Sequence, residues 1–302
     1  MQIHRLYFLL FFVFDCTESS VDGFYFMPND TMLTKVDENE SSRLGAICGR
    51  SSSKRQYPWS VSLALHGFNK LNGVIISQYH ILTVAHGFLR FDNSKHGACV
   101  VINYKEFQTV AMKNIRAVAI DHRFAEGRCI NGHDWAIIEL EEPITFNDYV
   151  SPICLPFARQ PIRPILTAAG WGRPSGKLTT ANLYVCLAFE NTDPRINEKL
   201  MRHDETCTAP ITDLMPTRSE DYLCAKSLDP TNPLSSRVCH GDSGSGLQQS
   251  DSNGITNTLV GLTSFGTNGC PANELARFTR VSNYVDTICR LTGVCYRVKI
   301  KA

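Results

Sequence analysis

The segment PWSVSLALH, residues 58–66, sets bulky apolar side chains in strict alternation with smaller or polar ones. After Pro58 the residues are, in order, Trp59, Ser60, Val61, Ser62, Leu63, Ala64, Leu65 and His66. Because successive side chains of a β-strand point to opposite faces of a sheet, this period of two predicts a strand with one buried face. The segment therefore indicates the start of a β-rich domain.

Further short apolar runs follow at irregular intervals, separated by clusters of Gly, Asn, Pro and Asp. They read GVIISQYHILTV, RAVAI, DWAIIEL, NLYVCLAF and NTLVGLTSF. Many short strands with turn residues between them are typical of an all-β sandwich or barrel. A helix is predicted only over residues 281–291, where Val281, Tyr284, Val285 and Ile288 lie near helical spacing.

The composition limits the classes of function. The chain has 302 residues, of which 43% are apolar and 20% charged, so it can bury one or two cores and global disorder is excluded. Its formal net charge is +1 and it has no polybasic run, which gives no attraction towards nucleic acid or anionic lipid. We therefore expect neither a nucleic-acid partner nor a membrane partner.

The N-terminus has the organisation of a secretory signal. Weak positive charge at His4 and Arg5 precedes an apolar run from Leu6 to Phe14 that is too short to span a bilayer. We expect a signal peptide over residues 1–20 and export to the extracellular space. The alternative interpretation is a buried apolar strand at the N-terminus.

Residues 21–57 are polar and show no sustained periodicity, so we interpret them as a propeptide or N-terminal arm, with the folded domain over residues 58–302. Two sequons for N-glycosylation lie in this arm, at Asn29 and Asn39. The twelve cysteines of the chain indicate an oxidising compartment, where cysteines form disulfides. No CxxC pair occurs, so a zinc site has no ligand cluster to start from; no metal ligand is assigned and no cofactor is implied.

Three short runs supply the groups that peptide hydrolysis by a serine requires. They are TVAHG with His86, HDWAIIEL with Asp134 and GDSGSG with Ser243. The hydroxyl needs a base to take its proton, a carboxylate to orient that base, and N–H donors for the developing oxyanion. Taken singly, each run has a structural interpretation: a core histidine, a capping aspartate or a tight glycine-rich loop. Their order and their position beside apolar strands favour the catalytic interpretation.

Together with further motifs, these runs resemble the trypsin- and chymotrypsin-like serine proteases. The supporting motifs are PWSVSL, ILTVAH, DWAIIEL, PICLP, AAGWG, GDSG, TSFG and FTRVSNYV, in this order along the chain. The flanking segments DENESSRLGAICG and ICRLTGVC look like those of divergent trypsin-like proteins of nematodes. The resemblance implies an all-β, chymotrypsin-like fold of two antiparallel six-stranded β-barrels with a C-terminal helix.

The resemblance also assigns catalytic roles. In this family the histidine and the aspartate come from the first barrel and the serine from the second. It implies that His86 is the general base, Asp134 its orienting partner, and Ser243 the nucleophile that forms an acyl-enzyme. The backbone N–H groups of Gly241 and Ser243 would form the oxyanion hole.

Other positions would determine the substrate specificity. Arg237 stands where trypsins carry an aspartate, so cleavage after Arg or Lys should be disfavoured. An inward guanidinium would suit a substrate Asp or Glu; alternatively, Arg237 turns to solvent or fills the pocket. Ala276 stands where many members have glycine and narrows the site slightly. Ser264, Phe265 and Gly266 would form the edge strand along which a substrate backbone pairs.

The resemblance implies three of the disulfides. These are Cys239–Cys270, Cys207–Cys224 and Cys48–Cys154. The remaining cysteines leave Cys99–Cys129 and Cys289–Cys295 as candidate pairs. Cys186 is then left over if Cys16 departs with the signal peptide.

Activation is the point at which the chain departs most from the family. There, cleavage after a basic residue frees an Ile-Val-Gly-Gly start whose amine pairs with the aspartate before the serine, here Asp242. The matching position is near Ile47, but Ala46 precedes it instead of Arg or Lys. Either residues 47–49 are a remnant of that start, or Cys48 is the propeptide cysteine and the start is absent. Other cuts would follow Arg43, Arg50, Lys54 or Arg55.

We therefore expect a secreted, monomeric serine endopeptidase, made as a zymogen, that hydrolyses peptide bonds through a His-Asp-Ser triad without trypsin-like specificity. Its partners would be protein or peptide substrates and protein inhibitors of proteases. The alternative is a non-catalytic protease homologue that binds or regulates other proteins, which the missing activation start and the unusual pocket favour. A disulfide-rich adhesion protein would explain the cysteines but not the three runs together.

Overall fold

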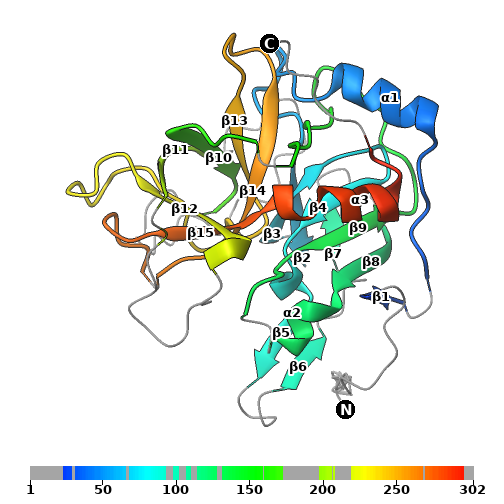
Figure 1. Ribbon diagram of the computed structural model, residues 1–302, viewed down its shortest axis with the longest axis horizontal. Coiled ribbons are helices and arrows are strands. Elements are labelled where there is room, and N and C mark those ends of the chain that lie inside the picture. Colours follow the sequence, from blue (N-terminus) through cyan, green and yellow to red (C-terminus); the bar gives the residue numbers. More distant parts are fainter. Residues whose placement is uncertain are drawn as a thin grey trace, which may run out of the picture.

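The computed structural model is built mainly from two β-sheet bodies with few, short helices around them (Figure 1). It describes residues 23–28, 31–65, 68–92, 98–101, 107–109, 114–127, 131–158, 160–172, 197–205, 207, 219–267 and 269–295. The expected signal peptide, the sequon at Asn29 and the expected strand NLYVCLAF lie outside the described residues.

The N-terminal sheet is antiparallel, with the strand order β1-β8-β9-β4-β3-β2-β7. Its strands are β1 (Phe24–Met27), β2 (Ser60–Leu65), β3 (Phe68–Ile75), β4 (His80–Thr83), β7 (Phe107–Thr109), β8 (Ile115–Asp121) and β9 (Ala136–Leu140). A separate hairpin pairs β5 (Leu89–Asp92) with β6 (Ala98–Val101). Val61 and Leu63 of β2 are buried, as the alternation predicted, but Ser60 on the opposite face is also buried, at 6% exposed.

The C-terminal sheet closes into a six-stranded barrel in the order β10-β11-β12-β15-β14-β13. Its strands are β10 (Ile165–Gly170), β11 (Asn197–Asp204), β12 (Tyr222–Ser227), β13 (Gly246–Ser250), β14 (Asn257–Phe265) and β15 (Ala276–Arg280). Apolar side chains fill it, among them Leu166, Met201, Leu223, Leu247 and Phe278. Two β-bodies with one closed barrel confirm the all-β, chymotrypsin-like fold class.

The helices are short and lie at the edges of the sheets (Figure 1). The expected C-terminal helix forms as the 3₁₀ turn η6 (Val281–Asn283) followed by α3 (Val285–Thr292). Gly293 ends α3 at a φ of 75°, and a Cβ there would lie 2.2 Å from the carbonyl oxygen of Val36. Further short helical elements among the described residues include α2 (His122–Glu126) and the 3₁₀ turn η5 (Ser219–Asp221).

The segment interpreted as an arm forms regular structure that its sequence did not reveal. Strand β1 is buried and pairs with β8, so it adds a seventh strand to the six expected of the first barrel. Helix α1 (Glu38–Ile47) is capped at its N-terminus by Asp37, whose side chain accepts a hydrogen bond from the Glu40 N–H at 2.8 Å. Four apolar residues are too few to show a period, which is why β1 was missed. The domain boundary at residue 57 stays a prediction.

Four of the five expected disulfides are formed. They are Cys48–Cys154, Cys207–Cys224, Cys239–Cys270 and Cys289–Cys295. The fifth, Cys99–Cys129, involves a residue outside the described part of the chain, as does the leftover Cys186. The bond from Cys48 ties the end of α1 to the domain, and the Gly49 N–H donates to the Pro152 carbonyl at 2.8 Å beside it.

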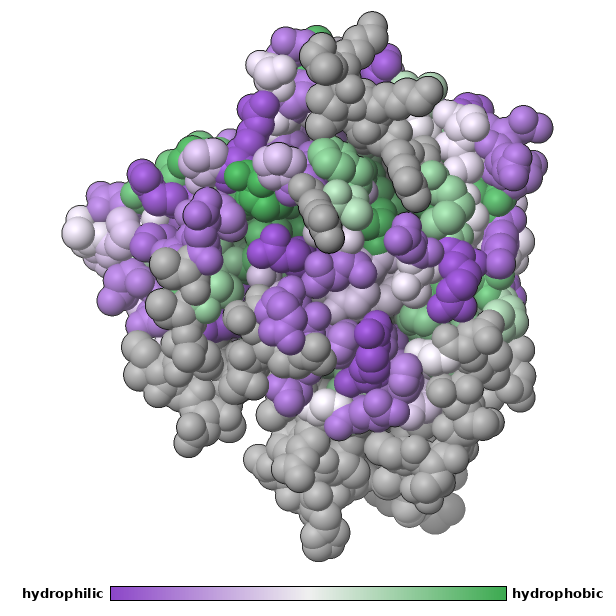
Figure 2. Space-filling view, viewed as in Figure 1, coloured by the Kyte–Doolittle hydropathy of each residue, from purple (hydrophilic) through white to green (hydrophobic). Residues whose placement is uncertain are grey.

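The outer surface of the molecule is more hydrophilic than these apolar cores. On the face in Figure 2, hydrophilic residues cover most of the coloured surface, and hydrophobic residues occupy smaller areas between them. The sequon residue Asn39 is exposed on α1. None of the helices in the described residues has the length and apolar character needed to cross a membrane.

His80, the first residue of β4, is buried completely, with its Nδ1 2.8 Å from Ser77 Oγ. Burial is the main reason that its pKa falls to about 4, although the charge of Glu139 opposes the change. Because this pKa lies below the unfolded value of about 6.5, neutral His80 stabilises the fold above about pH 6.5. That contribution is lost as the pH falls from about 6.5 towards 4.

We expect His80 to remove about 3 kcal/mol from the free energy of unfolding between pH 7 and pH 4. The His80→Gln variant should lose correspondingly less over the same interval, whatever its stability at pH 7. Urea unfolding at a series of pH values measures both slopes. Parallel slopes for the two proteins would contradict this prediction.

Candidate active site

His86 and Asp134 are brought together by neighbouring strands. His86 lies in the 3₁₀ turn η1 (Ala85–Gly87), which follows β4, and Asp134 precedes β9, the partner of β4. The His86 Nδ1–H donates to Asp134 Oδ2 at 2.7 Å, and the His86 backbone N–H donates to Oδ1 at 2.8 Å. Both hydrogen bonds hold the imidazole in one orientation and leave Nε2 as the acceptor.

Ser243 reaches the same imidazole from the other sheet. It lies in the loop before β13, and its Oγ–H donates to His86 Nε2 at 3.0 Å. The ring of Phe265 packs beside the imidazole, with 5.4 Å between ring centroids. The three residues therefore form one continuous chain of hydrogen bonds across the junction of the two sheets.

Asp134 is held ionised at the end of that chain. It is fully buried, and the Ser264 Oγ–H donates to its Oδ2. Burial by itself would raise the pKa of this carboxyl, but the charge of His86 and the hydrogen bonds from His86 and Ser264 outweigh burial and lower the pKa. A carboxylate with a lowered pKa can stabilise an imidazolium that forms beside it.

The serine loop has a backbone that only small residues permit. Gly241 has a φ of 90°, where side chains other than hydrogen are strained. Gly244 has a φ of 79°, and a Cβ there would lie 2.0 Å from the Asn72 carbonyl oxygen. Two asparagines of β3 brace the loop, since the Nδ2 groups of Asn69 and Asn72 donate to the Gly241 carbonyl at 3.0 and 2.7 Å.

The backbone N–H groups of Gly241 and Ser243 lie in this braced loop. With the Gly241 carbonyl bound to β3, neither the Gly241 N–H nor the Ser243 N–H donates to another of the described residues. Two unpaired N–H donors beside a serine hydroxyl are what a developing oxyanion needs. The loop geometry is therefore that expected of an oxyanion hole.

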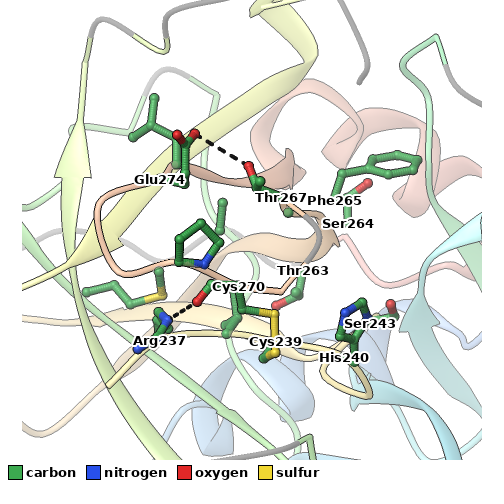
Figure 3. A pocket seen from close by; sticks show the side chains of 16 residues that line it. Arg237, Cys239, His240, Ser243, Thr263, Ser264, Phe265, Thr267, Cys270 and Glu274 are labelled. Carbon is green, nitrogen blue, oxygen red and sulfur yellow. Dashed lines mark hydrogen bonds between the residues drawn. A yellow bond between two sulfur atoms is a disulfide. The ribbon is translucent and has the colours of Figure 1, made fainter. Parts of the chain in front are cut away.

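A pocket opens next to Ser243 and contains the residues expected to choose the substrate (Figure 3). Its lining includes Arg237, His240, Thr263, Ser264, Phe265, Gly266, Glu274 and Ala276, together with the Cys239–Cys270 disulfide. Ala276 is the first residue of β15 and is 7% exposed. Arg237 and Glu274 lie on different walls, and Glu274 is turned towards the Thr267 hydroxyl (Figure 3).

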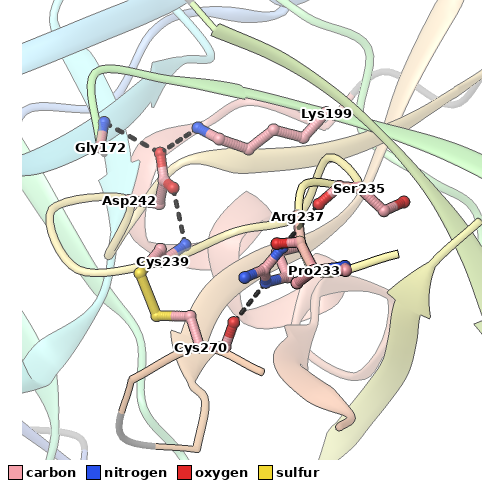
Figure 4. Close-up of a disulfide and its surroundings, with 8 residues drawn as sticks. All are labelled: Gly172, Lys199, Pro233, Ser235, Arg237, Cys239, Asp242 and Cys270. Atoms are coloured by element: carbon pink, nitrogen blue, oxygen red, sulfur yellow. Dashed lines mark hydrogen bonds and ion pairs between the residues drawn. A yellow bond between two sulfur atoms is a disulfide. The ribbon is translucent and has the colours of Figure 1, made fainter. Parts of the chain in front are cut away.

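Arg237 points inward, with only 7% of its surface exposed. Its Nε–H donates to the Cys270 carbonyl, and its Nη1 donates to the carbonyls of Pro233 and Ser235 at 3.0 and 2.7 Å (Figure 4). No hydrogen bond joins Nη2 to the described residues. The interpretation in which Arg237 turns to solvent is therefore wrong, because the side chain is buried and backbone carbonyls at the pocket base bind two of its three guanidinium nitrogens.

Asp242 has a cationic partner that the sequence did not suggest. The Lys199 Nζ donates to Asp242 Oδ1 at 2.6 Å, and the two side chains are 1% and 0% exposed (Figure 4). Ile47, the residue matched to the family's activation start, is instead the last residue of α1, and Cys48 after it is bonded to Cys154. The structure thus favours the interpretation of Cys48 as the propeptide cysteine.

One group of three metal-ligand residue types occurs in the described part of the chain: Cys239, His240 and Cys270. The two sulfurs are joined in a disulfide, so they offer no thiolate to a metal. The group therefore gives no support to a metal centre.

All of the predicted site residues lie around Ser243, but the site also contains residues that sequence reasoning missed. Asn69, Asn72 and Lys199 carry no motif, and Ser264 was expected only to line the substrate strand. The burial of Lys199 is seen only in the structure. Lys199 shares the buried face of β11 with Met201, since both are 1% exposed, whereas Leu200 between them is 39% exposed. A charged residue in the apolar phase of a strand indicates a buried partner.

A nucleophile, base and carboxylate in hydrogen-bond contact between two β-bodies is the arrangement of the chymotrypsin-like serine proteases. The trypsin family model matches residues 46–288, and the chain belongs to the trypsin family of serine proteases.

Three curated relatives agree with this assignment. Transmembrane protease serine 11B of Homo sapiens is 28% identical over 254 residues, which cover 82% of this chain and 56% of the relative. Transmembrane protease serine 11C of Mus musculus is 26% identical over 253 residues, covering 82% and 53%. CLIP domain-containing serine protease B15 of Anopheles gambiae is 26% identical over 264 residues, covering 79% and 67%. The chain thus spans little more than half the length of the two transmembrane proteases.

Proposed function

We propose that this protein is a secreted serine endopeptidase that cleaves proteins or peptides through an acyl-enzyme on Ser243. The observation that carries the proposal is the hydrogen-bond chain from Asp134 through His86 to Ser243, with contacts of 2.7 and 3.0 Å. A serine hydroxyl bound to a neutral imidazole whose other nitrogen donates to a carboxylate is an activated nucleophile.

The reaction follows from these contacts. Ser243 Oγ attacks the carbonyl carbon of the peptide while His86 Nε2 takes the hydroxyl proton, and the N–H groups of Gly241 and Ser243 stabilise the oxyanion. The C–N bond then breaks, the amine leaves with the proton from His86, and the acyl group stays on Ser243. A water that gives its proton to His86 attacks this ester, and the same proton returns to Ser243 Oγ as the acid product departs.

The substrate backbone would lie along the end of β14. Ser264, Phe265 and Gly266 line the pocket next to Ser243, and a Cβ added at Gly266 would meet no heavy atom within 4 Å. An extended peptide that pairs with this edge gains main-chain hydrogen bonds irrespective of its sequence. The adjoining pocket then selects the side chain that precedes the cleaved bond.

A non-catalytic homologue remains the second candidate. It is favoured by one observation, that Ile47 ends α1 and follows Ala46 instead of Arg or Lys, so the cut used in the family would not free an amine there. In that case Ser243 would have the geometry of the triad but no enhanced reactivity.

Labelling with a fluorophosphonate decides between the two candidates. The secreted full chain is treated with the probe, and the modified residue is identified by peptide mass spectrometry. We expect modification of Ser243, because its hydroxyl is activated by His86. Ser245 in the same loop is the internal control, since its Oγ bonds to Thr263 Oγ1 instead. No labelling of a folded protein, before or after limited proteolysis of residues 21–57, would favour the non-catalytic homologue.

The pocket supports a further part of the proposal, namely that cleavage after Arg or Lys is disfavoured. A basic substrate side chain would bring a second positive charge towards the buried guanidinium of Arg237. Placing like charges together out of water costs several kcal/mol, so kcat/KM for Arg or Lys peptides should be at least ~100-fold below that for Asp, Glu or small residues. The unpaired Nη2 favours an acidic side chain, whose carboxylate fits a guanidinium.

The Arg237→Met variant tests this prediction with a peptide series that differs only at the residue before the cleaved bond. We expect it to lose most of the discrimination against basic residues, because the charge is removed while the length of the side chain is kept. Arg202→Met is the matched control, since Arg202 is exposed on the outside of the same barrel. Preference of the unaltered protein for Arg or Lys would refute this interpretation of Arg237.

Export is supported by the disulfides. Cys48–Cys154 and Cys239–Cys270 are bonds of the kind that form and persist in oxidising compartments. Secretion from eukaryotic cells, followed by N-terminal sequencing of the released protein, tests this part of the proposal. Released protein that still carried residues 1–15 would contradict the signal-peptide interpretation.

A further inference from the structure

The buried ion pair between Lys199 and Asp242 lies directly under the serine loop. Asp242 stands between Gly241 and Ser243, whose N–H groups donate to no other residue in the described part of the chain. Its Oδ2 accepts the Cys239 N–H at 2.8 Å, and its Oδ1 accepts the Gly172 N–H at 3.0 Å (Figure 4). The carboxylate therefore fixes the conformation of the backbone that carries both donors.

Two glycines leave the space that the Asp242 carboxylate occupies. A Cβ added at Gly172 would lie 2.3 Å from the Asp242 carboxyl carbon, and one at Gly170 would lie 2.8 Å from Oδ1. A carboxylate taken fully out of water costs several kcal/mol unless a cation pairs with it. The fold thus makes room for an ionised Asp242 that depends on a partner.

Lys199 is that partner in the intact chain. Within the part of the chain that the structure describes, its ammonium is the one cationic group at ion-pair distance from Asp242. Lys199 lies on β11 opposite Ala168 of β10, the strand that leads into Gly170 and Gly172. Closure of the barrel therefore places the Lys199 ammonium beside the Asp242 carboxylate without any cleavage of the chain.

We propose that Lys199 is a positioning residue that supplies the cation Asp242 requires, so that the oxyanion hole forms in the uncut chain. This inference rests on the proposed function, because it concerns how the same site becomes competent. The amine freed by cleavage in other family members is replaced here by a side chain that is always present. Proteolysis of residues 21–57 is then not required for activity.

The balance of charges at Asp242 agrees with this role. Burial raises the pKa of the Asp242 carboxyl, and the charge of Lys199 is the largest influence that opposes the change. Without Lys199 the carboxyl would take up a proton or leave its site. Either event releases the hydrogen bonds to Cys239 and Gly172 that hold the serine loop.

The first experiment uses the full secreted chain with the last four basic residues before Pro58 replaced. The substitutions are Arg43→Gln, Arg50→Gln, Lys54→Gln and Arg55→Gln. We expect this protein, shown by mass spectrometry to be uncut, to be labelled at Ser243 by a fluorophosphonate at the rate of the unaltered chain. Labelling that appears only after a protease cuts residues 21–57 would overturn the inference and leave the proposed function intact.

The second experiment removes the ammonium from the uncut protein. We expect Lys199→Met to slow labelling and peptide hydrolysis about 100-fold or more, the loss typical of a missing oxyanion donor. The loss should fall on kcat, because the pocket walls and the β14 edge are retained. The matched control is Lys226→Met, which removes the 3.0 Å ion pair with Asp204 on the neighbouring strand and should label normally.

Chemical rescue separates positioning from folding. Propylamine added to Lys199→Ala should restore labelling in a concentration-dependent manner, because the alkylammonium can occupy the space left by the side chain. Uncut Lys199→Met or Lys199→Ala that folds and labels at the normal rate would overturn the inference. If Lys199→Met does not fold, the question is decided by the labelling rate of the uncut chain and by that of Lys199→Arg. We expect uncut Lys199→Arg to be labelled, because it keeps a cation beside Asp242. An absence of labelling in every folded form, cut or uncut, would reject the proposed function itself.

Discussion

Replacing Ser243 by alanine is expected to lower kcat for peptide hydrolysis by about 10⁶-fold, with little change in the unfolding transition. In the proposed mechanism the hydroxyl attacks the substrate, and its 3.0 Å contact with His86 Nε2 is the path by which the imidazole takes its proton. Residual hydrolysis should come from the N–H groups of Gly241 and Ser243, which remain able to bind an oxyanion.

Active-site titration and steady-state kinetics on the best substrate of the specificity series measure this loss. The matched control is Ser245→Ala, which removes a buried hydroxyl two residues away that bonds to Thr263. We expect the control to keep its kcat within about tenfold, because no proton passes through that hydroxyl. Equal rates for Ser243→Ala and the unaltered protein would show that the nucleophile has been misassigned.

Replacing Asp134 by asparagine is expected to lower kcat by about 10⁴-fold. The variant keeps the shape and the burial of the side chain, but its amide can present an N–H to His86 Nδ1. The imidazole then carries its proton on Nε2, where it can no longer accept the proton of Ser243. The neutral amide also withdraws the charge that stabilises the imidazolium.

The pH dependence of this variant separates it from a folding defect. In the unaltered protein the lowered pKa of Asp134 keeps the carboxylate ionised throughout the neutral range. Activity of Asp134→Asn should therefore rise towards high pH, because more of the imidazole is deprotonated and hydroxide becomes available as a base. Ser264→Ala removes only one hydrogen bond to the carboxylate and should cost far less. A loss as large in Ser264→Ala as in Asp134→Asn would contradict the assigned role.

Much of the fold was predictable because it depends on local periodicity. The alternation after Pro58 predicted β2, and the apolar runs RAVAI and NTLVGLTSF became β8 and β14. Strand β1 and helix α1 were not predicted. Their apolar residues are few, and burial of Leu44 against the core is decided by packing rather than by pattern.

The residues of the site can also be divided into those that the sequence predicted and those that it did not. The motifs around His86, Asp134 and Ser243 named the groups for the proposed chemistry, since each motif combines a reactive side chain with the strand or the glycines that present it. The residues that support the serine loop could not be predicted. Asn72 and Lys199 belong to no motif, and they acquire their roles only when the barrels place them under the loop.

By itself, the sequence of this protein determined the β-rich class and the chemical groups of the site, and its resemblance to the family implied three of the four disulfides formed among the described residues. Tertiary structure alone decided that Arg237 points inward and that Lys199 meets Asp242. The physical reason is distance along the chain. Lys199 and Asp242 are 43 positions apart, and no local pattern relates them. Only the closure of the barrel buries both charges in one place, where each becomes stable because the other is there.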